Sequence, residues 1–208
     1  AGQVDKGAGA PYWQHPVAVM RTLPPFASED LKKSALLHDS VEDTAFKPEG
    51  DRLVYNDDKF AALDDNMKAA KRPAEIALAR KRGEADPENT PPILTSPPLN
   101  GHILSVVEGV TNDDFTPPAD LSREEAGKLV LAHYQDHIIE LANDRPSDPE
   151  ALRVAEDRVL LKFTDMSQNV NKQRLSAISD KTRVTWFAEK YERPFNALLK
   201  RVKEIAAK

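Results

Sequence analysis

Apolar residues recur three and four positions apart over much of the chain, the spacing that places them on one face of an α-helix. The clearest helix is predicted over residues 122–143, where Ser122 and Glu125 have the spacing of a capping box. Further helices are predicted over residues 148–170 and 181–207. The last should be disturbed near Pro194, because proline lacks the N–H that a helix interior needs.

The first part of the chain also predicts helices. Pro16 suits the first turn of a helix that runs to residue 23 and ends at Pro24-Pro25. Ser28 is a good N-cap, and two acidic residues follow it in the first turn. We expect this second helix to continue to Thr44.

The middle of the chain is more polar. Residues 45–56 are rich in turn formers and are predicted as a loop. A helical pattern follows over residues 57–83, with a break at Pro73, and residues 84–100 form a proline-rich extended loop. Residues 103–111 have the β-branched content of a strand, but their helical neighbours favour a helix. With no repeat and no second domain in view, we predict one all-α domain over residues 1–208, with a long insertion at about 45–100.

Composition narrows the functional classes. The chain has 208 residues, of which 40% are hydrophobic and 30% charged, and a net charge of −5, so we expect a folded protein without a nucleic-acid partner. It has no cysteine, which excludes disulfides, thiolate nucleophiles and cysteine-ligated zinc. No apolar run approaches the roughly 18 residues of a membrane span, and no signal peptide is visible. We therefore expect a cytoplasmic enzyme that does not bind membranes.

The densest cluster of chemically useful side chains comprises His38, Asp39, Glu42 and Asp43. In a helix that continues to residue 44, His38 and Glu42 share a face, and so do Asp39 and Asp43. Three carboxylates so close together are costly unless a cation or solvent compensates them. The stretch therefore indicates a metal site.

Three more candidates lie far away in the sequence. His15 stands at the start of a predicted helix, Asp165 lies at the polar end of helix 148–170, and Asn169 follows one turn later on the same face. Imidazole and carboxylate together bind zinc, manganese or iron, and two histidines with two aspartates leave positions open for water and substrate. Glu42 and Asp43 are then placed to orient the water or take its proton.

Ordinary structural roles are compatible with the same residues. Asp165 can satisfy local backbone groups, and His15 can be a loop histidine. His133 and His137 are four residues apart but lack the glutamate of a zincin motif, and His102 is expected at the end of a loop.

Four stretches occur together in one order in a known family. They are Pro11-Tyr12-Trp13-Gln14-His15-Pro16, Leu37-His38-Asp39-Ser40-Val41-Glu42-Asp43-Thr44, Val107-Glu108-Gly109-Val110-Thr111, and Leu161-Lys162-Phe163-Thr164-Asp165 continuing to Asn169. In these stretches the chain resembles the HD-domain hydrolases of RelA/SpoT type, especially the small stand-alone alarmone hydrolases similar to the metazoan SpoT homologue.

The resemblance implies an all-α HD-domain helical bundle with one manganese ion. It assigns as metal ligands His15, His38, Asp39 and Asp165. It assigns water activation to Glu42 and Asp43, and substrate contact to Lys6 and Asn169. The implied reaction removes the 3′-pyrophosphate from guanosine tetra- or pentaphosphate, so the expected partner is a small nucleotide.

Other substrates and roles remain open. The family usually has Arg-Leu-His-Asn where this chain has Met166-Ser167-Gln168-Asn169, and two adjacent basic residues where Asp5-Lys6 stands. The site could instead serve another nucleotide, such as NADPH or ppApp, or belong to a nucleotide-binding regulatory module. The sequence leaves the oligomeric state undetermined.

Overall fold

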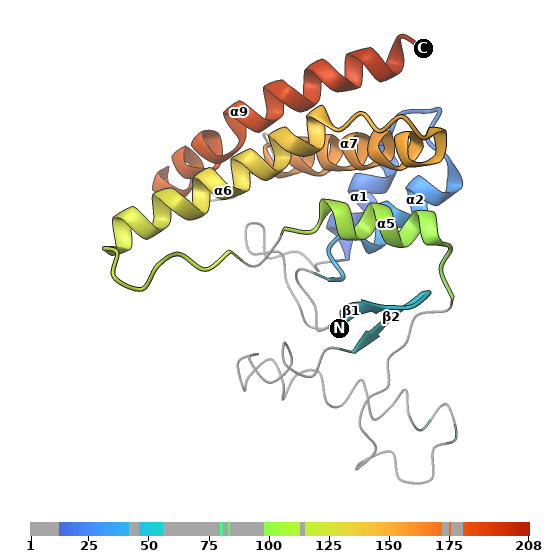
Figure 1. Ribbon diagram of the computed structural model, residues 1–208, viewed down its shortest axis with the longest axis horizontal. Helices are drawn as coiled ribbons and strands as arrows, with labels where there is room; N and C mark the ends of the chain where they lie inside the picture. The colour runs from blue at the N-terminus through green and yellow to red at the C-terminus, as the bar shows by residue number, and fades with distance from the viewer. Residues whose placement is uncertain are drawn as a thin grey trace.

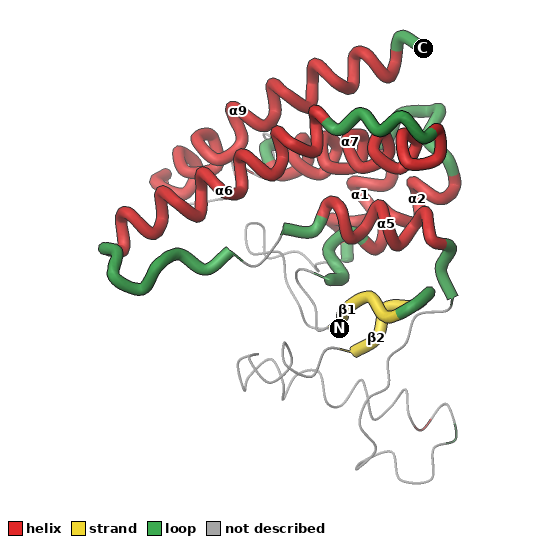
Figure 2. Tube along the Cα trace, viewed as in Figure 1, coloured by secondary structure: helices red, strands yellow, loops and turns green. Residues whose placement is uncertain are grey.

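The computed structural model describes residues 13–41, 46–55, 80, 83, 98–112, 115–171, 175 and 181–208. These residues are mostly helical, with six helices and one two-stranded hairpin (Figures 1 and 2). The helices are α1 (Gln14–Thr22), α2 (Glu29–Leu37), α5 (Gly101–Val110), α6 (Arg123–Asn143), α7 (Pro149–Asn169) and α9 (Lys181–Ala206). The prediction of a mostly helical fold is confirmed. Residues 57–79 and most of 84–100 lie outside the described residues. None of the described helices is both long and apolar enough to cross a membrane.

Helix starts follow the local signals in the sequence. The Ser28 hydroxyl accepts a hydrogen bond from the amide of residue 31, 3.0 Å away. Ser122 and Glu125 form the predicted capping box, in which each side chain bonds the backbone amide of the other residue. Asp148 caps α7 with Pro149 at the first helical position, where the missing N–H costs nothing.

The end of α2 differs from the prediction. The helix stops at Leu37, and residues 38–41 form a turn instead of continuing to residue 44. Both the amide and the hydroxyl of Ser40 donate to the Leu37 carbonyl, at 2.8 and 2.6 Å. This i to i+3 closure tightens the chain where a helix would form an i to i+4 bond. The prediction that this helix continues to residue 44 is therefore wrong, and the predicted face shared by His38 and Glu42 falls partly outside the described residues, since Glu42 is not among them.

A hairpin replaces part of the loop predicted over residues 45–56. Strands β1 (Phe46–Glu49) and β2 (Arg52–Tyr55) pair in antiparallel fashion. Gly50 lies in the connecting turn with a φ of 62°, a conformation that glycine adopts without steric cost. Leu53 is buried, which gives the hairpin an apolar anchor. The all-α prediction is thus wrong for this short segment.

The hydrophobic core surrounds α7, which packs against each of the other five helices. One group comprises α1, α2 and α5, and the other pairs α6 with α9 (Figure 1). The core side chains of α7 are Val159, Leu160, Leu161 and Met166. Burying each of these contributes about 1.5–3 kcal/mol relative to leaving it exposed. The centre of the fold therefore carries one of the candidate functional residues, Asp165, within its apolar helix.

Pro194 lies inside α9, and the helix continues through it. Its missing N–H leaves the carbonyl of Lys190 without its helical partner. The side-chain amide of Gln135, on α6, donates to the carbonyls of Glu189 at 2.9 Å and Lys190 at 3.4 Å. Arg193 in turn donates to the Gln135 carbonyl oxygen at 3.4 Å. The side chain of Gln135 on α6 thus donates a hydrogen bond to the Lys190 carbonyl of α9, in place of the N–H that Pro194 lacks.

Replacing Gln135 with leucine should lower the free energy of unfolding by about 1–3 kcal/mol, since it leaves the Lys190 carbonyl without its donor at a part-buried contact. Urea denaturation followed by circular dichroism measures the change. In a Pro194→Ala background the cost should be smaller, because the new amide can bond the Lys190 carbonyl. Equal costs in the two backgrounds would contradict this explanation.

Candidate metal centre

His15 reaches the site from the first turn of α1 and is buried. Its Nε2 atom lies 3.1 Å from Asp165 Oδ1 and 3.5 Å from Asp39 Oδ2. Asp165 is 150 positions away along the chain. The packing of α1 against α7 therefore brings the two together.

His38 caps the C-terminus of α2, and Asp39 follows in the turn. The Nδ1–H group of His38 donates to the carbonyl of Ala35, 2.8 Å away. This bond directs Nε2 to the opposite side, where it lies 3.1 Å from Asp39 Oδ1 and 3.6 Å from Asp165 Oδ1. The rings of His15 and His38 lie 5.5 Å apart between centroids. The early end of α2 thus places both residues at the site.

Asp165 is buried in α7 and is the third part of the cluster, after His15 on α1 and the His38–Asp39 pair at the end of α2. Asn169 donates from Nδ2 to Asp165 Oδ1 at 2.8 Å, so the two share a helix face, as their spacing predicts. The structure therefore brings together His15, His38, Asp39 and Asp165, the four residues that the resemblance assigns as ligands. The Nε2 atom of each histidine lies 3.1–3.6 Å from a carboxylate oxygen of each aspartate.

The buried charges of the site shift two pKa values. Burial alone would lower the pKa of His38, but its contact with Asp165 and the charge of Asp39 raise it to about 9. Burial alone would raise the pKa of Asp165. The hydrogen bond from His15 and the close contact with His38, with the charges of His38 and Lys162, instead hold that pKa well below its usual range. In the absence of a metal, an imidazolium and a carboxylate therefore face each other.

Lys162 also contributes to the electrostatic environment of Asp165, and it was not among the predicted site residues. Its side chain is buried, and its ammonium group donates to the carbonyl of Val110, the last residue of α5, at 3.0 Å. A cation is favourable there because the carbonyl end of a helix carries partial negative charge. The sequence did contain a signal for this residue: Lys162 lies within an apolar stretch of α7. A lysine that is buried there requires a partner, so its position could have indicated a polar contact.

The arrangement fits a divalent cation. Ligand atoms of His15, His38 and Asp39 all lie within 4.8 Å of one another, and Asp165 Oδ1 is in contact with both imidazoles. For metal–ligand bonds of about 2.1 Å, neighbouring ligand atoms are about 3.0 Å apart in octahedral and about 3.4 Å apart in tetrahedral geometry. Within the described residues, Nε2 of His38 is buried without a hydrogen bond. Its Nδ1–H bond to a backbone carbonyl selects the tautomer that a metal ligand requires.

Other predicted residues lie elsewhere. Glu42, Asp43 and Lys6 are outside the described residues. His102 belongs to the first turn of α5 rather than to a loop, and its Nε2 lies 2.8 Å from an oxygen of Asp157 on α7. His133 stacks on Phe115 with 4.4 Å between ring centroids. Neither histidine adds to the cluster.

Comparison of the chain with protein-family models, with curated proteins and with solved structures finds no match. The motifs and the geometry of the site are therefore the basis of any functional conclusion.

Without metal, the protein should lose stability between about pH 6.5 and 9. The pKa of His38 rises from 6.5 to about 9 on folding, so its contribution is complete below pH 6.5 and is lost towards pH 9. We expect the free energy of unfolding of EDTA-treated protein to fall by on the order of 3 kcal/mol across this window, measured by urea denaturation. His38→Asn cannot titrate and should flatten the profile. A profile that this variant leaves unchanged would refute the assignment.

Proposed function

We propose that the protein is a metal-dependent phosphohydrolase of HD type that removes the 3′-pyrophosphate from guanosine tetra- or pentaphosphate. The observation that carries the proposal is the convergence of two imidazole nitrogens and two carboxylates from α1, the end of α2 and α7. These are the four residues that the resemblance assigns as metal ligands. The mostly helical fold is compatible with an HD-domain bundle.

The ligand set supports manganese or a similar ion. Two imidazoles and two carboxylates suit borderline divalent metals and leave coordination positions for water and a substrate oxygen. When bound, such an ion supplies Lewis acidity, which polarises a phosphoryl oxygen and increases the acidity of water. His15, His38, Asp39 and Asp165 would hold it. Contacts with His15 and His38 hold the pKa of Asp165 low against its burial, and the charge of Lys162 adds to their effect.

The chain's own groups then have distinct roles. Glu42 and Asp43 would orient the attacking water and accept its proton. The water oxygen attacks the phosphorus next to the 3′ oxygen, and the bond between that phosphorus and the 3′ oxygen breaks. The 3′ oxygen takes up a proton, and the products are pyrophosphate and GDP or GTP.

Asn169 has a double role in this proposal. Its amide donates to Asp165 Oδ1, which orients the carboxylate. Its half-buried position at the end of α7 leaves it beside the site, where the resemblance assigns substrate contact. Lys6 is proposed as a second substrate contact, for the phosphate groups.

Asp39→Ala should abolish Mn²⁺ binding and lower hydrolysis by more than about 100-fold, since it removes a ligand of the ion. The assay measures Mn²⁺-dependent release of pyrophosphate from guanosine tetraphosphate, with products identified by mass. Asp120→Ala is the matched control, because Asp120 is exposed in the loop before α6. Full hydrolytic activity in the Asp39→Ala variant would contradict the proposal.

A nucleotide panel tests the substrate. Guanosine tetraphosphate should be turned over at least 10-fold faster than NADPH or ppApp. Faster release of the 2′-phosphate of NADPH would retain the metal site and replace the substrate. Tight Mn²⁺-dependent nucleotide binding without hydrolysis would instead support a regulatory module.

A further inference from the structure

Three side chains make polar contacts between α5 and α7 among the described residues, and one of the three is a histidine. Arg158 of α7 donates from Nε and Nη2 to the carbonyl of Ser105, at 3.0 and 2.8 Å. Lys162 donates to the carbonyl of Val110 at the end of α5, as described above. Arginine and lysine stay protonated well above pH 7. The third contact comes from His102, in the first turn of α5.

The ring of His102 lies between two carboxylates of α7. Its side chain is 6% exposed, with Nε2 at 2.8 Å from Asp157 Oδ2 and Nδ1 at 3.3 Å from Glu150 Oε1. A neutral imidazole has one N–H group and can donate to only one of these oxygens, whereas an imidazolium can donate to both. The geometry therefore suits the protonated ring.

The charges on α7 around this contact favour the same form of the ring. Burial raises the pKa of Asp157, and the contact with His102 opposes that rise, so the ionised carboxylate benefits from a charged partner. Arg153 donates to Glu150 Oε1 at 2.8 Å and offsets part of the negative charge. Glu156 adds negative charge near Asp157 and is itself paired with a cation of α9.

The residues just before His102 connect the start of α5 to two other elements. The amide of Leu99 donates to the carbonyl of Asp51, in the turn between β1 and β2, at 2.7 Å. The side chain of Asn100, the N-cap of α5, donates to Asp30 of α2 at 2.9 Å. The charged groups near these two bonds are Asp30 and Lys33, paired at 3.7 Å, and Asp51 and Arg52, also paired at 3.7 Å. Residues 99, 100 and 102 thus form a junction of the hairpin, α2 and α7.

We propose that His102 is a proton-operated latch at this junction. With its ring protonated, it donates to Asp157 and Glu150 and holds the first turn of α5 against α7. When the ring loses a proton, it loses its charge and one of the two hydrogen bonds, and the first turn opens more often. An ordinary imidazole changes charge between about pH 5 and 8, so the latch responds near neutral pH.

The far end of α5 stays docked in this proposal, because Arg158 and Lys162 keep their charges over the same pH range. The opening is therefore confined to the start of the helix. The proposal goes beyond the phosphohydrolase activity and does not depend on it.

Amide hydrogen exchange followed by NMR measures the opening residue by residue. The amides of Ile103 and Leu104 bond to the side chain and the carbonyl of Asn100, at 2.9 and 3.3 Å, so they report on the first turn. Their protection, corrected for intrinsic exchange, should fall at least about 5-fold between pH 5.5 and 8 in the full chain. The amide of Val110 is the internal reference for global unfolding, and its protection should change less.

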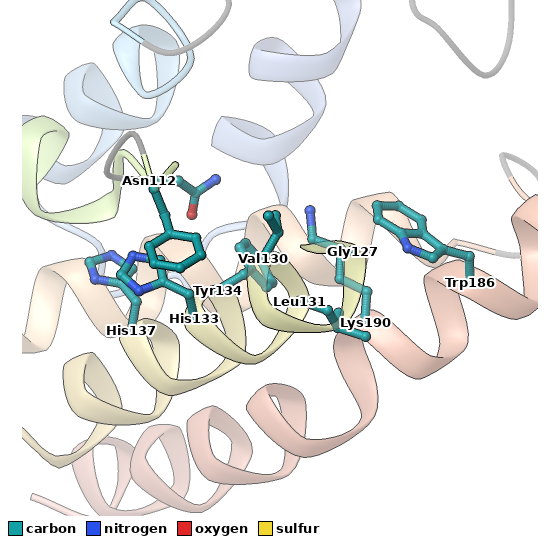
Figure 3. A pocket seen from close by; sticks show the side chains of 10 residues that line it. Asn112, Gly127, Val130, Leu131, His133, Tyr134, His137, Trp186 and Lys190 are labelled. Atoms are coloured by element: carbon teal, nitrogen blue, oxygen red, sulfur yellow. The ribbon is translucent and has the colours of Figure 1, made fainter. Parts of the chain in front are cut away.

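Two histidine variants separate the latch from other titrating groups. His102→Gln can still donate to Asp157 but cannot titrate, so the protection of Ile103 and Leu104 should follow that of Val110. His133→Gln is the matched control. His133 is on α6, in the wall of a cavity of about 390 Å³ shown in Figure 3, and stacks on Phe115. This variant should keep the pH dependence of the wild type.

Glu150→Gln gives a second test at an exposed position, where the fold tolerates the change. The ring signal of His102 is assigned by its absence from the His102→Gln spectrum. In Glu150→Gln the ring should lose its proton at a lower pH than in the wild type, because a carboxylate that stabilises the imidazolium is gone.

Three results would overturn the proposal. They are an equal change in protection at Ile103 and Val110 of the wild type, a pH dependence at Ile103 that survives in His102→Gln, and an unchanged titration of the His102 ring in Glu150→Gln.

Discussion

The buried carboxylate of Asp165 is the group on which the arrangement of α1, α2 and α7 depends. A carboxylate in an apolar interior is stable only if hydrogen bonds and opposite charge replace the water that it loses. Here His15 comes from α1, His38 from the end of α2, and Lys162 and Asn169 from the neighbouring turns of α7. Compensation of one charge thus draws contacts from three helices, and the same contacts assemble a candidate site for a cation.

In the other group of helices, hydrogen bonds to backbone carbonyls contribute to the contact between α6 and α9. Pro194 removes a hydrogen bond from α9, and Gln135 of α6 restores it from outside the helix. That contact joins α6 to α9. Because α7 packs against both groups, Lys162 connects them: the charge of Lys162 helps to lower the pKa of Asp165, and its ammonium group lies 5.8 Å from the centroid of the Tyr134 ring on α6.

Two local predictions were wrong for related reasons. The apolar and acidic pattern after Ser28 was compatible with a helix to residue 44, but the hydroxyl and amide of Ser40 close a tight turn on Leu37. The polar stretch after it was compatible with a loop, but it forms a hairpin with Leu53 buried. The first outcome depends on the bonds of Ser40, and the second is accompanied by a glycine turn at Gly50 and one buried leucine, Leu53. Periodicity over several residues carries no signal for such local features.

The sequence by itself determined the mostly helical class, most helix starts and the residue types of the candidate metal centre. Caps such as Ser28, Ser122 and Asp148 act within three residues, so their hydrogen bonds can be read from neighbouring positions. Only the tertiary structure decided that His15 contacts Asp165, which is 150 positions away in the chain. It also decided that the charge of Lys162 acts on the same carboxylate. Such contacts depend on how helices pack, which involves many weak interactions between distant residues and has no local pattern.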